Sequence, residues 1–386
     1  MKRITTFICC LIVAISGTAR AQEPKVVVPG DLKGTRPVLI TVSGFGGEVD
    51  SVLRFDLFVQ GFEFVTADKA QFQLAGSNSG RVEGRLIDPL TKQQILAKAY
   101  TGTSLRTQAH ALADEIVEAI LHMKGIGRTK IAFKCDKGST SEIYIADFDG
   151  HNAEAATADG SIVAAPTWAP GRRALYYTSY KLSNPDIYSQ TLASGERHIV
   201  ARYSGLNTSA AISPDGRHVA MILSRSGSPN VWIADADGAN LRQVTKIPEG
   251  ASSPCWSPDG TTICFSSSST GRAALYLVSA AGGQPRRLST VGTPNATEPD
   301  WSPDGKTIVF TSQMGDFQIC TVPASGGEAA VLAAGEDPSW APNSRTVVFA
   351  RRAGGKRILS MLDAPTKRVK ELPAISGSCS QPSWSK

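Results

Sequence analysis

The stretch Trp256-Ser257-Pro258-Asp259-Gly260, followed after two polar residues by the apolar run Ile263-Cys264-Phe265, recurs throughout the second half of the chain. Close copies begin at Ile212 and Trp301, and looser copies begin at Trp168, Trp340 and Trp384. The first residues of these copies, at 168, 212, 256, 301, 340 and 384, lie 39 to 45 residues apart. A fixed spacing of this size indicates a repeat architecture.

Each repeat contains the signals of four short strands. Proline presets the backbone at the second position of a turn, and Asp-Gly tolerates the left-handed geometry that follows, so the motif predicts a tight hairpin. The apolar run after it is a second strand, and a third lies about 19 residues after the start of each copy, as at Ile187-Tyr188 and Val231-Trp232. A further turn and a weaker fourth strand complete the unit. Four antiparallel strands in each repeat predict one blade of a β-propeller.

The two ends of the repeat region complement each other. Residues 129–150 match a blade that lacks its first strand, whereas residues 381–384 match a first strand that lacks its blade. We therefore expect six blades over residues 129–386, with the C-terminal strand, residues 380–386, completing the first blade and hiding an exposed sheet edge.

The N-terminal third contains three segments of different character. Residues 1–21 have Lys2 and Arg3 before a short apolar run, which predicts an export signal cleaved after Ala21, with a retained membrane anchor as the alternative. Residues 22–36 are polar and rich in proline and glycine, so we expect them to be mobile. Residues 37–126 predict a small α/β domain that ends in a helix, because apolar residues recur at three- and four-residue steps from Leu105 to Met123, before Gly125.

The charge of the chain excludes one function class, and its cysteine content leaves the pairing of thiols open. Removal of the signal leaves 37 basic and 34 acidic residues from the 40 and 34 of the full chain, and the basic residues are interspersed, so nucleic-acid binding is not expected. Five cysteines remain, at positions 135, 255, 264, 320 and 379. Cys255 with Cys264, or Cys135 with Cys379, could form a disulfide, but buried thiols are the interpretation that we favour because no framework spacing is visible.

Signals of catalysis are few. The chain has no Gly-x-Ser-x-Gly or His-Glu-x-x-His motif, and its five histidines lack the spacing of metal ligands, so we predict no catalytic residue, no cofactor and no metal site. One set of polar residues precedes the first strands of the blades, where a propeller has its channel mouth: Asn207, Thr208, Ser209, Ser252, Ser253, Thr297, Glu298, Glu336, Asp337, Ser380 and Gln381. This ring favours contact with another protein. The alternative is a cation site made by Glu298, Glu336 and Asp337, as in propeller lactonases or related hydrolases.

The junction Met123-Lys124-Gly125-Ile126-Gly127-Arg128-Thr129-Lys130 and the following residues 131–150 resemble the domain junction and first blade of the TolB family of the Tol-Pal system. Thr297-Glu298-Pro299-Asp300-Trp301 is similar to a blade entry of that family. The resemblance implies a monomeric periplasmic protein that reaches the outer membrane through its partners and serves membrane integrity and constriction in cell division.

The resemblance also implies two partners and the residues that bind them. A peptidoglycan-associated lipoprotein would contact the channel mouth at Leu206, Asn207, Ser209, Ser252, Thr297 and Glu298. A TolA-like inner-membrane protein would bind residues 22–34, above all Gln22, Glu23, Pro24, Lys25, Val26, Val27 and Val28. The competing hypotheses are the metal-dependent propeller enzyme and a periplasmic scaffold with another ligand.

Overall fold

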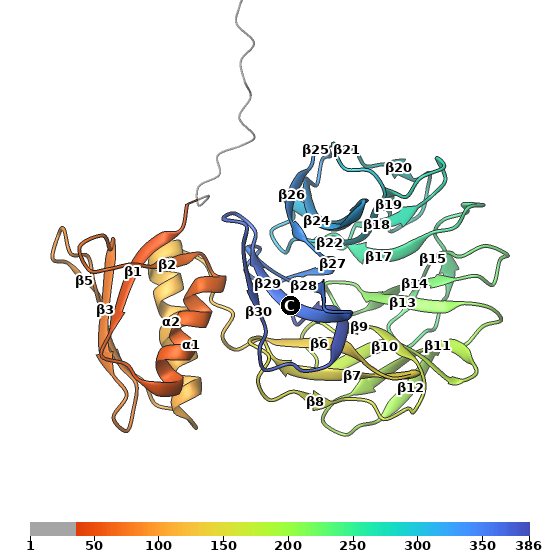
Figure 1. The fold of residues 1–386 in the computed structure, drawn as a ribbon. Coiled ribbons are helices and arrows are strands. Elements are labelled where there is room, and N and C mark those ends of the chain that lie inside the picture. The colour runs from red at the N-terminus through yellow and green to blue at the C-terminus, as the bar shows by residue number, and fades with distance from the viewer. Residues whose placement is uncertain (1–35) are drawn as a thin grey trace, which may run out of the picture. The chain divides into compact units, whose positions relative to one another are not determined.

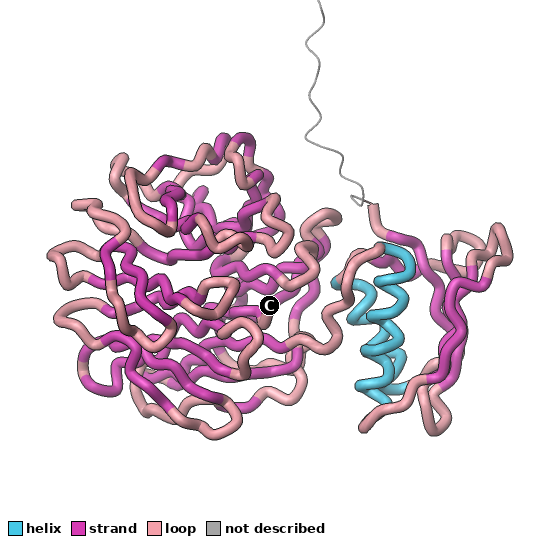
Figure 2. Tube along the Cα trace, turned by 180° about the vertical axis from the view of Figure 1, so that it is seen from behind, coloured by secondary structure: helices cyan, strands magenta, loops and turns pink. Residues whose placement is uncertain are grey.

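The computed structural model describes residues 36–386, and the predicted export signal therefore lies outside the described residues. The α/β domain consists of β1 (Val38–Ser43), α1 (Gly47–Val59), β2 (Phe62–Phe64), β3 (Phe72–Ser77), β4 (Glu83–Ile87), β5 (Gln94–Ala99) and α2 (Leu105–Leu121). Its sheet has the order β2-β1-β3-β4-β5, in which β1 is parallel to both neighbours and β4 is antiparallel to both of its own. Both helices pack on one face of this sheet (Figure 2).

The apolar stripe predicted for the domain's last helix forms the buried face of α2. Ala109, Leu112 and Ile116 are fully buried, and the Ser104 hydroxyl caps the first turn by accepting from the Thr107 backbone N–H at 3.1 Å. The helix stops at Leu121, earlier than Met123, because His122 adopts the left-handed conformation with φ of 55°. Neither helix of residues 36–386 is long and apolar enough to cross a membrane.

Six four-stranded sheets follow and form the β-propeller, which confirms the predicted fold class (Figure 1). Blades 2 to 4 take their strands in chain order. Blade 2 contains β9 (Val163–Trp168), β10 (Ala174–Leu182), β11 (Asn184–Thr191) and β12 (Arg197–Ala201), and blade 3 contains β13 (Asn207–Ile212), β14 (His218–Leu223), β15 (Asn230–Asp235) and β16 (Arg242–Gln243). Blade 4 contains β17 (Ser252–Trp256), β18 (Thr262–Ser267), β19 (Ala274–Ser279) and β20 (Arg286–Arg287).

Blades 5 and 6 and the first blade complete the ring. Blade 5 contains β22 (Ala296–Trp301), β23 (Thr307–Met314), β24 (Asp316–Pro323) and β26 (Ala330–Ala334), and blade 6 contains β27 (Glu336–Trp340), β28 (Thr346–Ala353), β29 (Lys356–Asp363) and β30 (Arg368–Glu371). Two short strands, β21 (Thr290–Val291) and β25 (Gly327–Glu328), pair with each other in parallel. Blade 1 has the order β31-β6-β7-β8, from β31 (Ser378–Trp384), β6 (Lys130–Lys137), β7 (Thr140–Asp147) and β8 (Glu154–Ala155).

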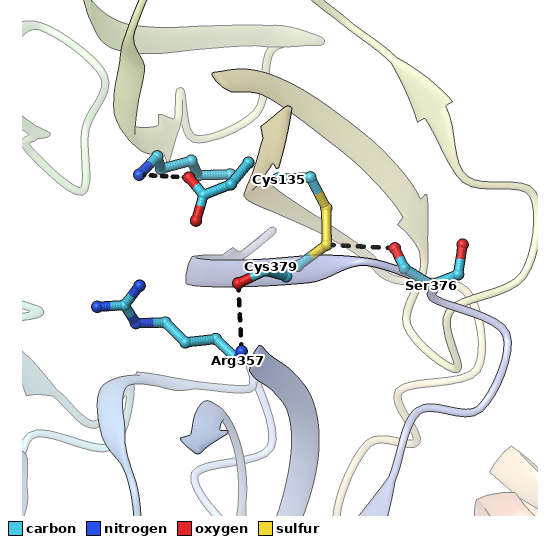
Figure 3. The surroundings of a disulfide bond; sticks show 7 residues. Cys135, Arg357, Ser376 and Cys379 are labelled. Atoms are coloured by element: carbon cyan, nitrogen blue, oxygen red, sulfur yellow. Dashed lines mark hydrogen bonds and ion pairs between the residues drawn. A yellow bond between two sulfur atoms is a disulfide. The ribbon is translucent and has the colours of Figure 1, made fainter. Parts of the chain in front are cut away.

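The last strand of the chain pairs with the first strand of the propeller region. Trp384 lies opposite Ile131 and Cys379 lies opposite Cys135 in the β31–β6 register, and Figure 1 shows the blue C-terminal end beside the yellow β6. Cys135 and Cys379 form a disulfide between residues separated by 244 positions (Figure 3). The interpretation of all five cysteines as buried thiols was therefore wrong for this pair, because ring closure places two distant strand residues directly opposite each other.

The side chains of the recurring motif hold its hairpin together. In blade 4 the Ser257 hydroxyl donates to Asp259, and Asp259 accepts from the Thr261 backbone N–H at 3.0 Å. Ser257 also accepts from the Thr262 N–H at 3.0 Å. Trp256 donates from Nε1 to the Ala211 carbonyl of blade 3 at 2.9 Å. The Ser and Asp therefore fix the turn, and the Trp ties one blade to the preceding blade.

Candidate functional site

Six residues, one from each blade, line a common cavity of about 550 Å³ in the propeller channel. Each lies three positions before the first residue of a motif copy, and each has a left-handed backbone with φ between 49° and 57°. These residues, which we call the channel ring, are Ala165, Ser209, Ser253, Glu298, Asp337 and Gln381.

A bulge in every first strand creates the ring. The register with the second strand shifts at the ring residue and its successor in all six blades. The successor is proline in five blades, as in Glu298-Pro299, and alanine only at Ala210. Proline cannot donate to the strand ladder and is confined to edges and bulges, so the sequence itself interrupts the ladder at this place. Left-handed non-glycine residues are strained and gather at functional sites, which favours a binding role for the ring.

Three hydrogen bonds join four of the six ring residues from blade to blade. The Asp337 N–H donates to Glu298 Oε2 at 3.1 Å, and the Gln381 N–H donates to Asp337 Oδ2 at 3.0 Å. The Ala165 N–H donates to Gln381 Oε1 at 2.9 Å. The blade-to-blade hydrogen bonds end at Ala165, because its side chain has no acceptor for the N–H of the next ring residue. The side chains of Ser209 and Ser253 are short. The channel therefore has an acceptor-rich half and a half with small side chains.

The two acidic side chains of the ring interact electrostatically. Burial and the neighbouring Glu298 carboxylate raise the pKa of Asp337 to about 7. Glu298 also accepts from the Thr311 hydroxyl at 2.7 Å. Because the ring residues on both sides lack a cationic side chain, this part of the channel favours a ligand that donates hydrogen bonds or carries positive charge.

The structure distributes the predicted lipoprotein-binding residues over the mouth. Ser209 and Glu298 belong to the channel ring, whereas Thr297 and Ser252 each lie one position before a ring residue. Ser252 is exposed, and its hydroxyl lies 2.8 Å from that of Ser266. The predicted TolA segment, residues 22–34, lies outside the described residues.

Leu206 and Asn207, at the entry to β13 of blade 3, differ in exposure. Leu206 is 39% exposed, but Asn207 is fully buried. The Asn207 amide donates to the carbonyls of Tyr203 at 2.8 Å and Pro185 at 3.0 Å, and it accepts from the Tyr203 N–H at 2.9 Å. Asn207 thus holds the loop and thereby positions Leu206 at the surface.

Glu336 is separated from the other two carboxylates of the alternative cation site. Its oxygens accept from Arg352 Nη2 at 2.8 Å and from Arg357 Nε at 2.7 Å. Although burial opposes the shift, these guanidinium groups hold the pKa of Glu336 below its ordinary value. Within residues 36–386, Glu298, Glu336 and Asp337 do not form a cluster of the size that a metal ion requires.

A second group of ionisable residues lies between the α/β domain and blade 1. His110 of α2 contacts Asp56 of α1 through Nδ1 at 2.6 Å and Asp149 through Nε2 at 3.4 Å. Arg106 forms an ion pair with Asp149 as well. We call these four residues the interdomain cluster. The carboxylates of Asp56 and Asp149 raise the pKa of His110 against the effect of burial, and burial raises the pKa of Asp56 to about 6.

Several of these residues escaped sequence reasoning. Ala165 could have been found, since it lies at the same distance from Trp168 as Glu298 does from Trp301. No regular spacing in the sequence pointed to Arg352 and Arg357. They reach Glu336 only because the hairpin between β28 and β29 folds back between them. The interdomain cluster joins residues from two helices and a blade turn, and no spacing in the sequence links them.

The fold and the channel ring define a six-bladed β-propeller with a polar channel mouth and an N-terminal α/β domain. The family model "TolB beta propeller domain" matches residues 117–386. The chain is 33% identical over 296 residues to the Tol-Pal system protein TolB of Bordetella pertussis, an alignment that covers 71% of this chain and 67% of that protein. The match to the Bordetella bronchiseptica protein of the same name is also 33% identical and covers 66% of it, so this chain spans about two thirds of these relatives.

Solved structures agree with the fold. The crystal structure of TolB from Acinetobacter baumannii aligns with a TM-score of 0.82 at 22% identity, covering 91% of this chain and 97% of that one. A putative TolB from Agrobacterium tumefaciens aligns with a TM-score of 0.53 at 21% identity, over 64% of this chain and 89% of that one. The chain belongs to the TolB family, which confirms the resemblance found in its sequence.

Proposed function

We propose that this chain is an exported, periplasmic component of a Tol-Pal system that binds a peptidoglycan-associated lipoprotein at its channel mouth and a TolA-like protein through residues 22–34. It would thereby couple the outer membrane to the inner-membrane machinery during constriction. Membership in the TolB family supports the assignment to the system. The channel ring is the observation that carries the lipoprotein site, because its six residues line one cavity and five of them have polar side chains.

The geometry of the mouth suits a protein partner. Each ring residue is held by its own blade, and three are also hydrogen-bonded to the next blade, so little side-chain and loop entropy is lost on binding. Leu206, three positions before Ser209 in the chain, adds an exposed apolar side chain. A loop of the lipoprotein that places donors against Glu298 and an apolar side chain against Leu206 would complement this surface.

We further propose that the chain acts by binding and not by catalysis. The alternative enzyme requires Glu336 as a ligand together with Glu298 and Asp337, but Glu336 already pairs with Arg352 and Arg357. Withdrawing it from these arginines would break the two ion pairs that hold the pKa of Glu336 below its ordinary value.

Reversing the charge of Glu298 tests the lipoprotein site. Glu298→Lys removes an acceptor of the Asp337 N–H and places a cation where we expect the partner's donors, so affinity for the soluble domain of the cognate lipoprotein should fall at least tenfold in calorimetric titration. Glu154→Lys, on the exposed outer strand of blade 1, is the matched control and should bind as the parent does. Equal affinity of the Glu298 variant and the parent would exclude Glu298 from the site.

Deleting residues 22–34 tests the second partner separately. A polar segment rich in proline and glycine has little to bury by itself and is suited to fold on a partner. The shortened protein should keep its unfolding temperature and its lipoprotein affinity but lose binding to the TolA-like protein. An unchanged affinity for the TolA-like protein would refute this role of the segment.

A further inference from the structure

Three cysteines of the propeller are free thiols, and all three belong to the apolar cluster between blades 4 and 5. Two of them form a pair across a hairpin: Cys255 on β17 lies directly opposite Cys264 on β18 in the antiparallel register. Directly opposite residues of antiparallel strands have Cα atoms about 4.5 to 5.5 Å apart, and disulfides bridge Cα separations of about 4.4 to 6.8 Å. The backbone therefore already holds this pair at bridging distance.

Blade 1 contains a disulfide between two cysteines that lie opposite each other in the same way. Cys135 and Cys379 are also directly opposite each other on the first two strands of a blade, and they are bonded. The inner hairpin of a blade in this protein thus accommodates a disulfide between opposed residues. Cys255 and Cys264 differ in that both thiols remain free.

The two thiols differ in their access to the channel. Cys255 is 8% exposed and lines the central cavity, whereas Cys264 is fully buried behind it. A small reagent in the channel therefore meets Cys255 first, and Cys264 is placed to react only with Cys255. Cys320 does not take part in this pair, since its thiol donates to the Gln318 carbonyl of its own strand at 3.7 Å.

We propose that Cys255 and Cys264 are a thiol modification site that accepts a disulfide oxidant from the channel and closes into a second disulfide. In the first step the Cys255 thiolate attacks one sulfur of the oxidant, a mixed disulfide forms and one thiolate of the oxidant leaves. In the second step the Cys264 thiolate attacks the Cys255 sulfur, and the second thiolate leaves. The oxidant gains two electrons, and the two cysteine protons pass to solvent.

The surroundings predict that this oxidation is slow at neutral pH. Hydrogen bonding to the Cys264 thiol and burial raise the pKa of Cys255, and only the thiolate attacks a disulfide. The rate should therefore rise about tenfold for each pH unit while the pH stays below that pKa. The proposal does not depend on the lipoprotein site, because it needs only the hairpin and the cavity.

Thiol counting on the folded, full-length exported protein tests the site. The protein is isolated without reductant, incubated with oxidised glutathione at pH 8.5, denatured and alkylated, and its mass gives the number of free thiols. We expect one free thiol, Cys320, and a cross-linked peptide that contains Cys255 and Cys264. A single thiol before incubation, with the same peptide, supports the site equally. Three free thiols after incubation, or a disulfide that includes Cys320, would overturn the proposal.

Serine variants distinguish the order of the two steps. Cys264→Ser should stop at one glutathione bound to Cys255, whereas Cys255→Ser should bind none because Cys264 is buried. Cys320→Ser is the matched control from the same apolar cluster and should still close the pair. Glutathione on Cys264 in the Cys255 variant would contradict the proposed route through the channel.

Discussion

The channel ring and the interdomain cluster both hold carboxylates, half-buried in the ring and fully buried in the cluster, but they stabilise them by different means. In the interdomain cluster Asp56 and Asp149 contact His110, and Asp149 also pairs with Arg106. In the channel ring Glu298 and Asp337 accept hydrogen bonds from backbone N–H groups of the next blade. Cations satisfy the first group from within the protein, whereas the second group keeps an uncompensated charge that a partner can use.

The difference separates a structural site from a binding site. Buried ion pairs that are complete have little left to offer a ligand, but they are costly to break. A carboxylate that accepts only from backbone N–H groups, and whose pKa a neighbouring carboxylate raises, can still accept a hydrogen bond from a partner. We expect mutations in the interdomain cluster to lower stability at neutral pH, and the charge reversal at Glu298 in the channel ring to lower binding.

The largest effect is expected for Asp149→Ala. It leaves Arg106 and His110 without their shared carboxylate in a buried place, so the free energy of unfolding should fall by about 3–5 kcal/mol. Urea unfolding at pH 7 measures the change, and Asp68→Ala, at an exposed turn, is the control. A loss no larger than that of the control would show that the cluster is not a strong interdomain tie.

A pH-dependent effect of intermediate size is expected for Asp337→Asn. The folded pKa of Asp337, about 7, exceeds the unfolded value of 3.8, so its ionisation destabilises the native state as pH rises from about 4 to 7 and adds nothing above that range. The parent should lose on the order of 1 kcal/mol for each pH unit in this window through Asp337, and the asparagine variant should not.

The measurement for this prediction is the free energy of unfolding of parent and variant at several pH values. Asparagine still accepts from the Gln381 N–H, so the geometry of the ring is preserved. The stability difference between variant and parent should therefore grow with pH. A constant difference from pH 4 to pH 8 would contradict the raised pKa of Asp337.

Another buried carboxylate, Asp186, sharpens the comparison, with the smallest effect. Both oxygens of Asp186 in blade 2 lack a hydrogen-bond partner, although Glu142 and Asn230 at the same place in blades 1 and 3 accept from the hydroxyls of Thr157 and Thr245. Blade 2 has Ala201 at the threonine position, opposite Ile187.

Ala201→Thr should supply the missing donor and stabilise the protein by about 1 kcal/mol, measured by thermal unfolding. Ala201→Val has nearly the same volume without the hydroxyl and is the matched control. If the two variants have equal stability, the hydroxyl makes no hydrogen bond to Asp186.

The sequence predicted the propeller because each blade is a local unit. The turn chemistry of Ser257, Pro258, Asp259 and Gly260 acts within a few residues, and repetition at a fixed spacing needs no tertiary information. For the same reason most of the channel ring could be named in advance, since each ring residue stands at a constant distance from its motif copy.

Only the tertiary structure decided the contacts between distant residues. Ring closure placed Cys135 opposite Cys379, and packing of two helices on a blade turn placed His110 between Asp56 and Asp149. The fold-back of the hairpin between β28 and β29 placed Arg352 and Arg357 at Glu336, so this carboxylate pairs with arginines whereas Glu298 and Asp337 interact with each other. Strand and turn formation depend on neighbours along the chain, whereas these pairings depend on how whole elements pack in space. No regular spacing in the sequence predicts such pairings.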